Sequence, residues 1–390
     1  LTQKRFLYDN LLESGAADST QWQAPVTIGQ AGSDKKTSFL MTDPTASVAL
    51  SGADSWIKVN AGQTAFFRVN YPVDEWERLK EGVTSLSLPP TDRLGLQNDA
   101  YALVRAGYLP ATSFLSLIEA FANEENAPVW GDVAASLRGL EALLLDTPYL
   151  DAYRSFARGL YTKIVEKVGW DAKPGEGHLD SLLRSTVIGQ HGGLGGETTL
   201  AEARRRFERY LADPESLHPD LRAVTFGLVA QQGGRSEYDT LWEMEKKARL
   251  HEEKMRILGA LTRFQDQGLL RELLDRSLTD EVRSQDVPLV IVSTAGNSKG
   301  RDLTWEFMKE HWDELDRRYG KGGFAIMRLV SITGGFTTPD REREVDEFFK
   351  THPAPSAART IQQALERIRL NVKWLEKNRD AVGEWLQTRG

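Results

Sequence analysis

The chain has 390 residues, of which 40% are hydrophobic and 27% are charged, and its formal net charge is −7. A chain of this length exceeds one ordinary hydrophobic core, so roughly two or three domains are expected. The negative charge offers no attraction to a phosphate backbone, which argues against nucleic acid as a partner. The sequence contains no cysteine, which excludes disulfides, thiolate nucleophiles and cysteine-ligated metal sites. No stretch of about eighteen apolar residues occurs, so no membrane span is predicted.

Residues 1–71 are predicted to form a small domain of short strands. The segment Ala65–Tyr71 alternates strictly, with Phe67, Val69 and Tyr71 on one face, which is the pattern of a half-buried strand. Turn residues separate it from similar segments at a spacing of about nine residues, which is typical of a small antiparallel β-sandwich. The predicted strands are residues 22–28, 37–42, 46–51, 55–60 and 64–71.

Residues 72–390 are predicted to be helical throughout. Pro72 ends the last strand, because proline cannot donate to a β-ladder. Phe114, Leu117 and Ile118 form one of many apolar stripes at helical spacing. Helix starts recur about every twenty residues, so a helix pair occupies about forty, which is the period of HEAT or armadillo repeats. The predicted fold is therefore mainly α, a HEAT/armadillo-like α-superhelix preceded by the small antiparallel β-sandwich.

No self-sufficient active site is predicted. His251 is followed by Glu252, but Met255 stands four residues after the histidine, so a helical His-Glu-x-x-His zinc site cannot form there. His251 is instead predicted to be a solvated residue at the start of a helix. The glycine cluster at residues 191–196 lacks the Lys-Ser/Thr of a phosphate-binding loop and is predicted to connect two helices. Catalytic residues and metal ligands are therefore not expected in this chain.

Several motifs together resemble the C-terminal half of the gluzincin zinc aminopeptidases of the aminopeptidase N and puromycin-sensitive type. The resemblance covers essentially all 390 residues, and the motifs follow one another in the same order. The motifs are AFFRVNYPVDEWERL, LPPTDRLGLQNDAYALVRAGYLP, VGWDAKPGEGHLDSLLRSTVI, HPDLRAVTFGLVAQQGG, DEVRSQDVPLVIVSTAGNSKGRDLTWEFMKEHW and RIRLNVKWLEKNRDAVGEWL.

The resemblance implies that the catalytic machinery lies elsewhere. In this family the zinc-binding His-Glu-x-x-His helix and the Gly-Ala-Met-Glu-Asn loop belong to an upstream domain, and neither motif occurs in this chain. Zinc is therefore expected in the missing catalytic domain, and this chain is expected to be inactive alone. Its implied role is to enclose the active site and to bind or size-select the peptide. The implied partners are its own N-terminal catalytic domain and peptide substrates. The likeness to the puromycin-sensitive branch implies a cytoplasmic protein, with a lost N-terminal signal or anchor left open because the first residue is Leu1.

Three arginines are the candidates for peptide binding that follow from the resemblance. A guanidinium matches a carboxylate bidentately, so arginines on a helical lining would hold the C-terminal carboxylate of a peptide. The candidates are Arg184, Arg222 and Arg283. The alternative is that each arginine pairs with a neighbouring helix. For Asp92, Arg93 and Asp99 a structural role is favoured over substrate contact.

A second hypothesis is a free-standing HEAT-like scaffold whose helices bind a partner protein. The β-domain argues against it, because solenoid scaffolds rarely need a sandwich at one end. If the aminopeptidase hypothesis holds, removal of the catalytic domain is expected to expose an apolar surface and to favour self-association.

Overall fold

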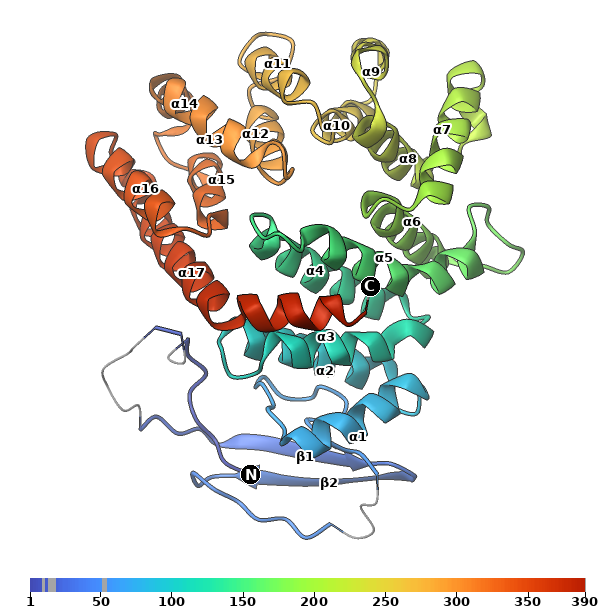
Figure 1. The fold of residues 1–390 in the computed structure, drawn as a ribbon, viewed down its shortest axis with the longest axis vertical. Coiled ribbons are helices and arrows are strands. Elements are labelled where there is room, and N and C mark those ends of the chain that lie inside the picture. Colours follow the sequence, from blue (N-terminus) through green and yellow to red (C-terminus); the bar gives the residue numbers. More distant parts are fainter. Residues whose placement is uncertain (9–10, 13–18, 51–54, 390) are drawn as a thin grey trace. The chain divides into compact units, whose positions relative to one another are not determined.

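The computed structural model describes residues 1–8, 11–12, 19–50 and 55–389 (Figure 1). This part of the chain contains seventeen α-helices and three β-strands, which confirms the predicted mainly α fold. The chain divides into two compact units. Unit 1 comprises residues 1–141, 151–187 and 373–390, and unit 2 comprises residues 142–150 and 188–372. The predicted domain boundary between residues 71 and 72 stays a prediction.

Unit 1 begins with a three-stranded antiparallel sheet of order β2-β1-β3. The strands are β1 (Ala24–Gln30), β2 (Ser33–Met41) and β3 (Ile57–Val59). Alternate residues of β1, Val26 and Ile28, are buried, as the period-two pattern requires. Ile28 pairs with Thr37 of β2 on one side and with Val59 of β3 on the other.

The predicted strand at residues 64–71 is wrong, because this segment is not a strand in the structure. Side chains, rather than a neighbouring strand, bond its backbone amides: Ala65 N donates to Asn60 Oδ1 at 3.0 Å, and Val69 N donates to Asp99 Oδ2 at 3.2 Å. Residues 46–50 are not a strand either, and position 51 lies outside the described residues. The strands found in residues 1–8, 11–12, 19–50 and 55–389 form one sheet, so the second layer of the expected sandwich is not seen there.

Helix α1 (Val73–Thr84) lies beside the short strand β3 and closes its edge. Ile57 N donates to Glu75 Oε1 at 2.6 Å, and Val59 N donates to the Tyr71 hydroxyl at 3.0 Å. Leu79 of α1 is fully buried. The edge amides that a further strand would use are therefore satisfied by side chains of the same unit.

The remaining helices of unit 1 come from both ends of the chain. The last helix begins in unit 2, and from residue 373 onward it belongs to unit 1. There the Trp374 indole donates to the Val104 carbonyl at 3.1 Å, and Asn378 Oδ1 accepts from the Ala111 amide at 3.1 Å. The helices that lie wholly or partly in unit 1, besides α1, are α2 (Pro90–Arg105), α3 (Ala111–Glu119), η1 (Ala120–Asn123), α4 (Ala127–Leu144), α5 (Leu150–Val168), α6 (His178–Gly193) and α17 (Ala358–Gln387).

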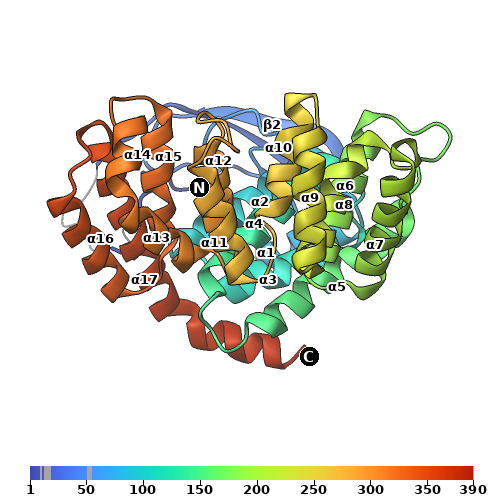
Figure 2. The same cartoon turned by 90° about the horizontal axis from the view of Figure 1, so that it is seen from above.

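Unit 2 is built of two rows of helices. In one row α8, α10, α12 and α15 pack in succession, while α7, α9, α11 and α13 lie alongside them (Figures 1 and 2). The elements are α7 (Glu197–Ala212), η2 (Pro214–Ser216), α8 (Pro219–Gln232), α9 (Arg235–Lys247), α10 (His251–Leu261), α11 (Gln267–Ser277), α12 (Val287–Ala295), α13 (Arg301–Glu310), α14 (Trp312–Tyr319), α15 (Phe324–Ser331), η3 (Ile332–Gly335), α16 (Pro339–Thr351) and η4 (Pro355–Ala357).

Two kinds of contact recur along unit 2. Ion pairs join successive helices of the row α7, α9, α11, α13 and α16. They are Arg204–Glu237 at 3.7 Å, Arg235–Glu272 at 2.7 Å, Arg271–Glu310 at 2.6 Å and Arg341–Asp302 at 2.9 Å. We call these four pairs the ion-pair ladder. In addition, the Asn297 and Asn371 side-chain amides each donate to two backbone carbonyls, which lie 33 to 37 residues earlier in the chain. This spacing is close to the predicted repeat; the HEAT-like description itself stays a prediction.

Candidate functional site

Two of the three candidate arginines contact the first turn of α10. Arg222 contacts Glu253 in this turn, and Arg283 contacts His251, the first residue of the helix. Both contacts lie within unit 2. We call Arg222, His251, Glu253, Arg283 and Asp286 the α10 cluster.

Arg222 is held by several acceptors. It lies in the first turn of α8, after the N-cap residue His218, and only 14% of its side chain is exposed. One Nη donates to Glu253 Oε1 at 3.3 Å and the other to the Pro214 carbonyl at 3.1 Å, while Nε donates to the Leu217 carbonyl at 3.4 Å. Its principal contacts therefore tie α8 to the preceding loop and to α10.

Arg283 is exposed and lies in a turn that connects α11 to α12. The turn is closed by a hydrogen bond from the Asp286 amide to the Arg283 carbonyl at 2.8 Å. Arg283 Nη1 lies 3.2 Å from Nδ1 of His251, and Asp286 Oδ1 lies 3.5 Å from Nε2 of the same imidazole. His251 thus stands between a guanidinium and a carboxylate that belong to the two ends of one turn.

Arg184 is not part of the α10 cluster. It belongs to unit 1, and only 4% of its side chain is exposed. Its Nη2 donates to Glu176 Oε2 at 2.6 Å and to the Val168 carbonyl at 3.3 Å. These contacts hold the loop before α6 against the end of α5. In the structure the Arg184 side chain is thus bonded to this loop. A peptide-binding role for Arg184 stays a prediction.

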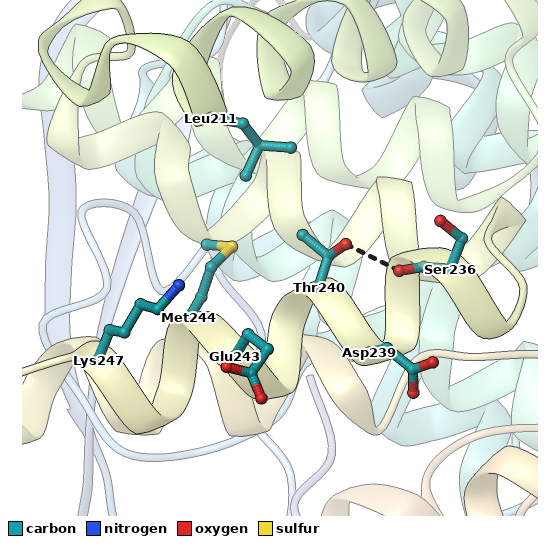
Figure 3. Close-up of a pocket in the computed structure, with 7 residues that line it drawn as sticks. All are labelled: Leu211, Ser236, Asp239, Thr240, Glu243, Met244 and Lys247. Atoms are coloured by element: carbon teal, nitrogen blue, oxygen red, sulfur yellow. Dashed lines mark hydrogen bonds between the residues drawn. The ribbon is translucent and has the colours of Figure 1, made fainter.

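A pocket of about 460 Å³ lies against one face of α9 (Figure 3). Its lining residues are Leu211, Ser236, Asp239, Thr240, Glu243, Met244 and Lys247. The Thr240 hydroxyl donates to the Ser236 carbonyl at 2.8 Å, as expected for a threonine within a helix. The lining contains two carboxylates and one ammonium group but no arginine or histidine, so it does not match the expected site for a peptide carboxylate.

The comparisons with known proteins decide the family. The family model described as "ERAP1-like C-terminal domain" matches residues 56–370. The chain belongs to this family. Aminopeptidase M1-A of Oryza sativa subsp. japonica is 34% identical over 383 residues, which cover 94% of this chain and 43% of that protein. Aminopeptidase M1 of Arabidopsis thaliana is 32% identical (96% of this chain, 44% of that protein), and the puromycin-sensitive aminopeptidase of Caenorhabditis elegans is 28% identical (99% and 42%).

The chain spans less than half the length of the curated relatives that it matches. The part of the chain that the structure describes contains no group of three or more histidine, aspartate or glutamate side chains placed to hold a metal ion. Within residues 1–8, 11–12, 19–50 and 55–389, no helix is both long enough and apolar enough to cross a membrane. The resemblance to the C-terminal half of an aminopeptidase is confirmed by the family match.

Asp92, Arg93 and Asp99 make internal contacts of the kind that their predicted structural role requires. Asp92 Oδ1 accepts from the Gly62 amide at 2.7 Å. Asp99 accepts from the amide of Val69, and burial raises the pKa of this carboxyl.

Arg93 makes a buried bidentate ion pair with Glu124, at 2.6 and 2.8 Å. Burial alone would raise the pKa of Glu124, but the bond from Arg93 and those from two backbone amides lower it below its ordinary value. These acidic and basic residues therefore make contacts that hold unit 1 together.

His251 was predicted correctly as the first residue of a helix, and 44% of its side chain is exposed. Its contacts with Arg283 and Asp286 were missed. The histidine and the arginine are 32 residues apart in the chain, and no periodicity relates a helix start to a turn of a later helix pair. Only a residue-by-residue alignment of the helical repeats would have placed the two together, and the repeats here are too dissimilar for that.

Proposed function

We propose that this chain is the non-catalytic C-terminal part of a zinc-dependent aminopeptidase, where it encloses the active site and helps to bind the peptide. The family match over residues 56–370 carries the proposal, together with relatives that are named aminopeptidases and are matched over 42 to 44% of their length. Zinc would be held by the catalytic part, since the described residues of this chain do not fit a zinc site. We also propose a cytoplasmic location, on the resemblance to the puromycin-sensitive branch.

The test compares this chain alone with the same chain joined to its catalytic part. The purified chain is expected to bind no stoichiometric zinc and to release no N-terminal residue from an aminoacyl reporter. The joined protein is expected to bind zinc and to cleave the reporter. Cleavage by the pure chain that a chelator abolishes and added zinc restores would refute the proposal.

Arg283 is the strongest of the three candidates for holding a peptide carboxylate. It is exposed, whereas Arg184 and Arg222 are 4% and 14% exposed and are bonded to acceptors of their own units. Leu250 is 67% exposed and adjoins His251 in the chain, and Leu289, 47% exposed, lies one turn after Asp286. The surface near Arg283 thus offers a guanidinium for a carboxylate and apolar groups for the side chains of a peptide.

Arg283→Gln is expected to weaken binding of a peptide with a free C-terminal carboxylate. An exposed ion pair contributes at most about 1 kcal/mol, so the loss of affinity is about three- to fivefold. Arg343→Gln is the matched control, because this arginine of α16 is 69% exposed and pairs locally with Asp340. The same peptide with an amidated C-terminus is expected to show no difference between the variants. Equal affinity of the native chain for the free and amidated peptides would exclude carboxylate recognition.

We further propose that the catalytic part covers an apolar surface of unit 1. Phe66 is 108% exposed, Val73 80% and Leu40 54%. Leu40 pairs with Pro25 across β1 and β2, so both project from the same face of the sheet. The isolated chain is expected to self-associate at high concentration, and Phe66→Ser is expected to reduce this. Sedimentation at increasing concentration measures both, and a strictly monomeric native chain would contradict the proposal.

The alternative, a free-standing HEAT-like scaffold, is not favoured by the comparisons. The relatives matched along this chain are named aminopeptidases, and each extends well beyond the matched part.

A further inference from the structure

His251 is contacted by both ends of the turn Arg283–Asp286. The imidazole Nδ1 lies 3.2 Å from Arg283 Nη1, and Nε2 lies 3.5 Å from Asp286 Oδ1. The turn is held on its other side by Tyr319 of α14, whose hydroxyl donates to the Ser284 carbonyl at 2.6 Å. Buried Val282 and Val287 anchor the chain before and after the turn. The position of the turn therefore does not depend on His251 alone.

The chemistry of the two neighbours fixes the protonation of the imidazole in this arrangement. An arginine side chain only donates hydrogen bonds, so Nδ1 of His251 must carry a lone pair to accept from Arg283. The single proton of the neutral ring is then on Nε2, where it faces the carboxylate of Asp286. A second proton, on Nδ1, would place two donors and two positive charges against each other, and the bond to Arg283 would be lost.

We propose that His251 is a positioning residue for Arg283. The neutral imidazole holds the guanidinium against α10, and protonation releases it to a peptide carboxylate while the electrostatic attraction between His251 and Asp286 strengthens. This inference rests on the proposed role of Arg283 in peptide binding. It predicts that binding of a carboxylate through Arg283 is stronger when His251 is protonated, and therefore stronger at lower pH.

The charged groups that follow His251 in the first turn of α10 are already paired. On α10 itself, Glu252 pairs with Arg256 at 2.8 Å, Glu253 with Arg222 of α8 at 3.3 Å, and Lys254 with Glu245 of α9 at 2.8 Å. From the turn, Arg283 and Asp286 face the ring. A proton added to His251 therefore acts on Arg283 first, because Arg283 is the cation bonded to the ring and its side chain is exposed and able to move.

The first experiment reads the tautomer directly. Nitrogen NMR distinguishes the two neutral tautomers of an imidazole, and the chain has only six histidines. His251→Gln assigns the signal of His251. At about pH 7.5, the neutral form of His251 is expected to be the Nε2-protonated tautomer. Arg283→Gln is expected to weaken this preference. His218 is the internal control, since its Nδ1 accepts from the Asp220 amide and Arg283 is not its partner.

The second experiment measures binding of a peptide with a free C-terminus at about pH 5.5 and about pH 7.5, on either side of the histidine range. The native chain is expected to bind about three- to fivefold more tightly at the lower pH. The difference is expected to disappear in His251→Gln and in Arg283→Gln, and with the amidated peptide.

The two experiments fail separately. If the neutral His251 of the native chain is protonated on Nδ1 at the higher pH, the positioning role is overturned. This holds for any result of the peptide-binding experiment. The expected tautomer together with unchanged affinity in Arg283→Gln would instead overturn the proposed peptide site, and with it the claim that release of Arg283 governs binding. A pH dependence that survives in His251→Gln would assign the effect to another group and refute the inference.

Discussion

Replacing Glu124 by alanine is expected to lower the free energy of unfolding of unit 1 by about 3–5 kcal/mol, because it breaks a buried ion pair and leaves a buried charge. The Glu124 and Arg93 side chains are 1% and 6% exposed. After the substitution, Arg93 keeps only the Leu88 carbonyl among its bonded acceptors. The Glu125 and Asn126 amides, which donate to Glu124 Oε1 at 2.9 and 2.8 Å, also lose their acceptor.

Unfolding in urea, with hydrogen exchange of the Glu125 and Asn126 amides, measures the loss. Glu124→Gln keeps a carbonyl acceptor for these amides and removes only the charge, so a smaller loss is expected. The control is Glu376→Ala, because Glu376 and its partner Lys373 are 56% and 51% exposed and such pairs contribute at most about 1 kcal/mol. If Glu124→Ala costs no more than Glu376→Ala, the assignment of Glu124 as a buried structural carboxylate is wrong.

Four further results are expected. The pKa of Glu124 is lowered in the folded chain, so the carboxylate stabilises the fold above the ordinary pKa of 4.5, and this stabilisation is lost as the pH falls through the lower folded pKa. Urea midpoints measured across this pH range check the loss. Glu124→Gln is expected to show a weaker acid dependence. Gly82→Ala is expected to destabilise by about 1–3 kcal/mol, because the added Cβ would lie 2.6 Å from an indole carbon. Gly131→Ala, in α4 with nothing within 4 Å, is expected to stabilise by up to about 1 kcal/mol, and a thermal unfolding experiment in which both changes have the same sign would contradict this. In the ion-pair ladder, a double-mutant cycle on Arg235 and Glu272 is expected to give a coupling below about 1 kcal/mol that weakens in high salt, and a salt-independent coupling would argue against an exposed pair.

The helical part of the chain was predictable because each helix carries its own apolar stripe. Phe114, Leu117 and Ile118, chosen for their spacing, are all buried in the structure. The strand prediction failed at residues 64–71 for a physical reason. The alternation is real, since Val69 and Tyr71 are buried while Phe66 is fully exposed. It reports burial within unit 1, where Val69 bonds to α2 and Tyr71 packs on Trp76 of α1, and not a β-ladder. Periodicity shows which face of a segment is buried, but it does not show which groups form hydrogen bonds with the backbone.

The site was less predictable than the fold. The arginines and their positions could be read from the sequence, but the residue that each arginine contacts could not. Arg222 and Arg283 find their partners 31 and 32 residues away, on a helix that the sequence does not link to them. Arg184 is buried against the segment at residues 168–177, so its role depends on how that segment folds. Exposure, which separates a binding arginine from a structural one, is a property of the packed chain.

The composition of unit 1 matters for its synthesis, because segments far apart in the sequence pack together in it. Trp374 and Asn378 reach carbonyl and amide groups that are translated about 270 residues earlier. The early helices α2 and α3 thus leave the ribosome without the segment that completes their packing, and they wait until residues 374 and 378 have been translated. A premature stop within α17 would leave the translated N-terminal region unfinished, although every residue of its own sequence was present.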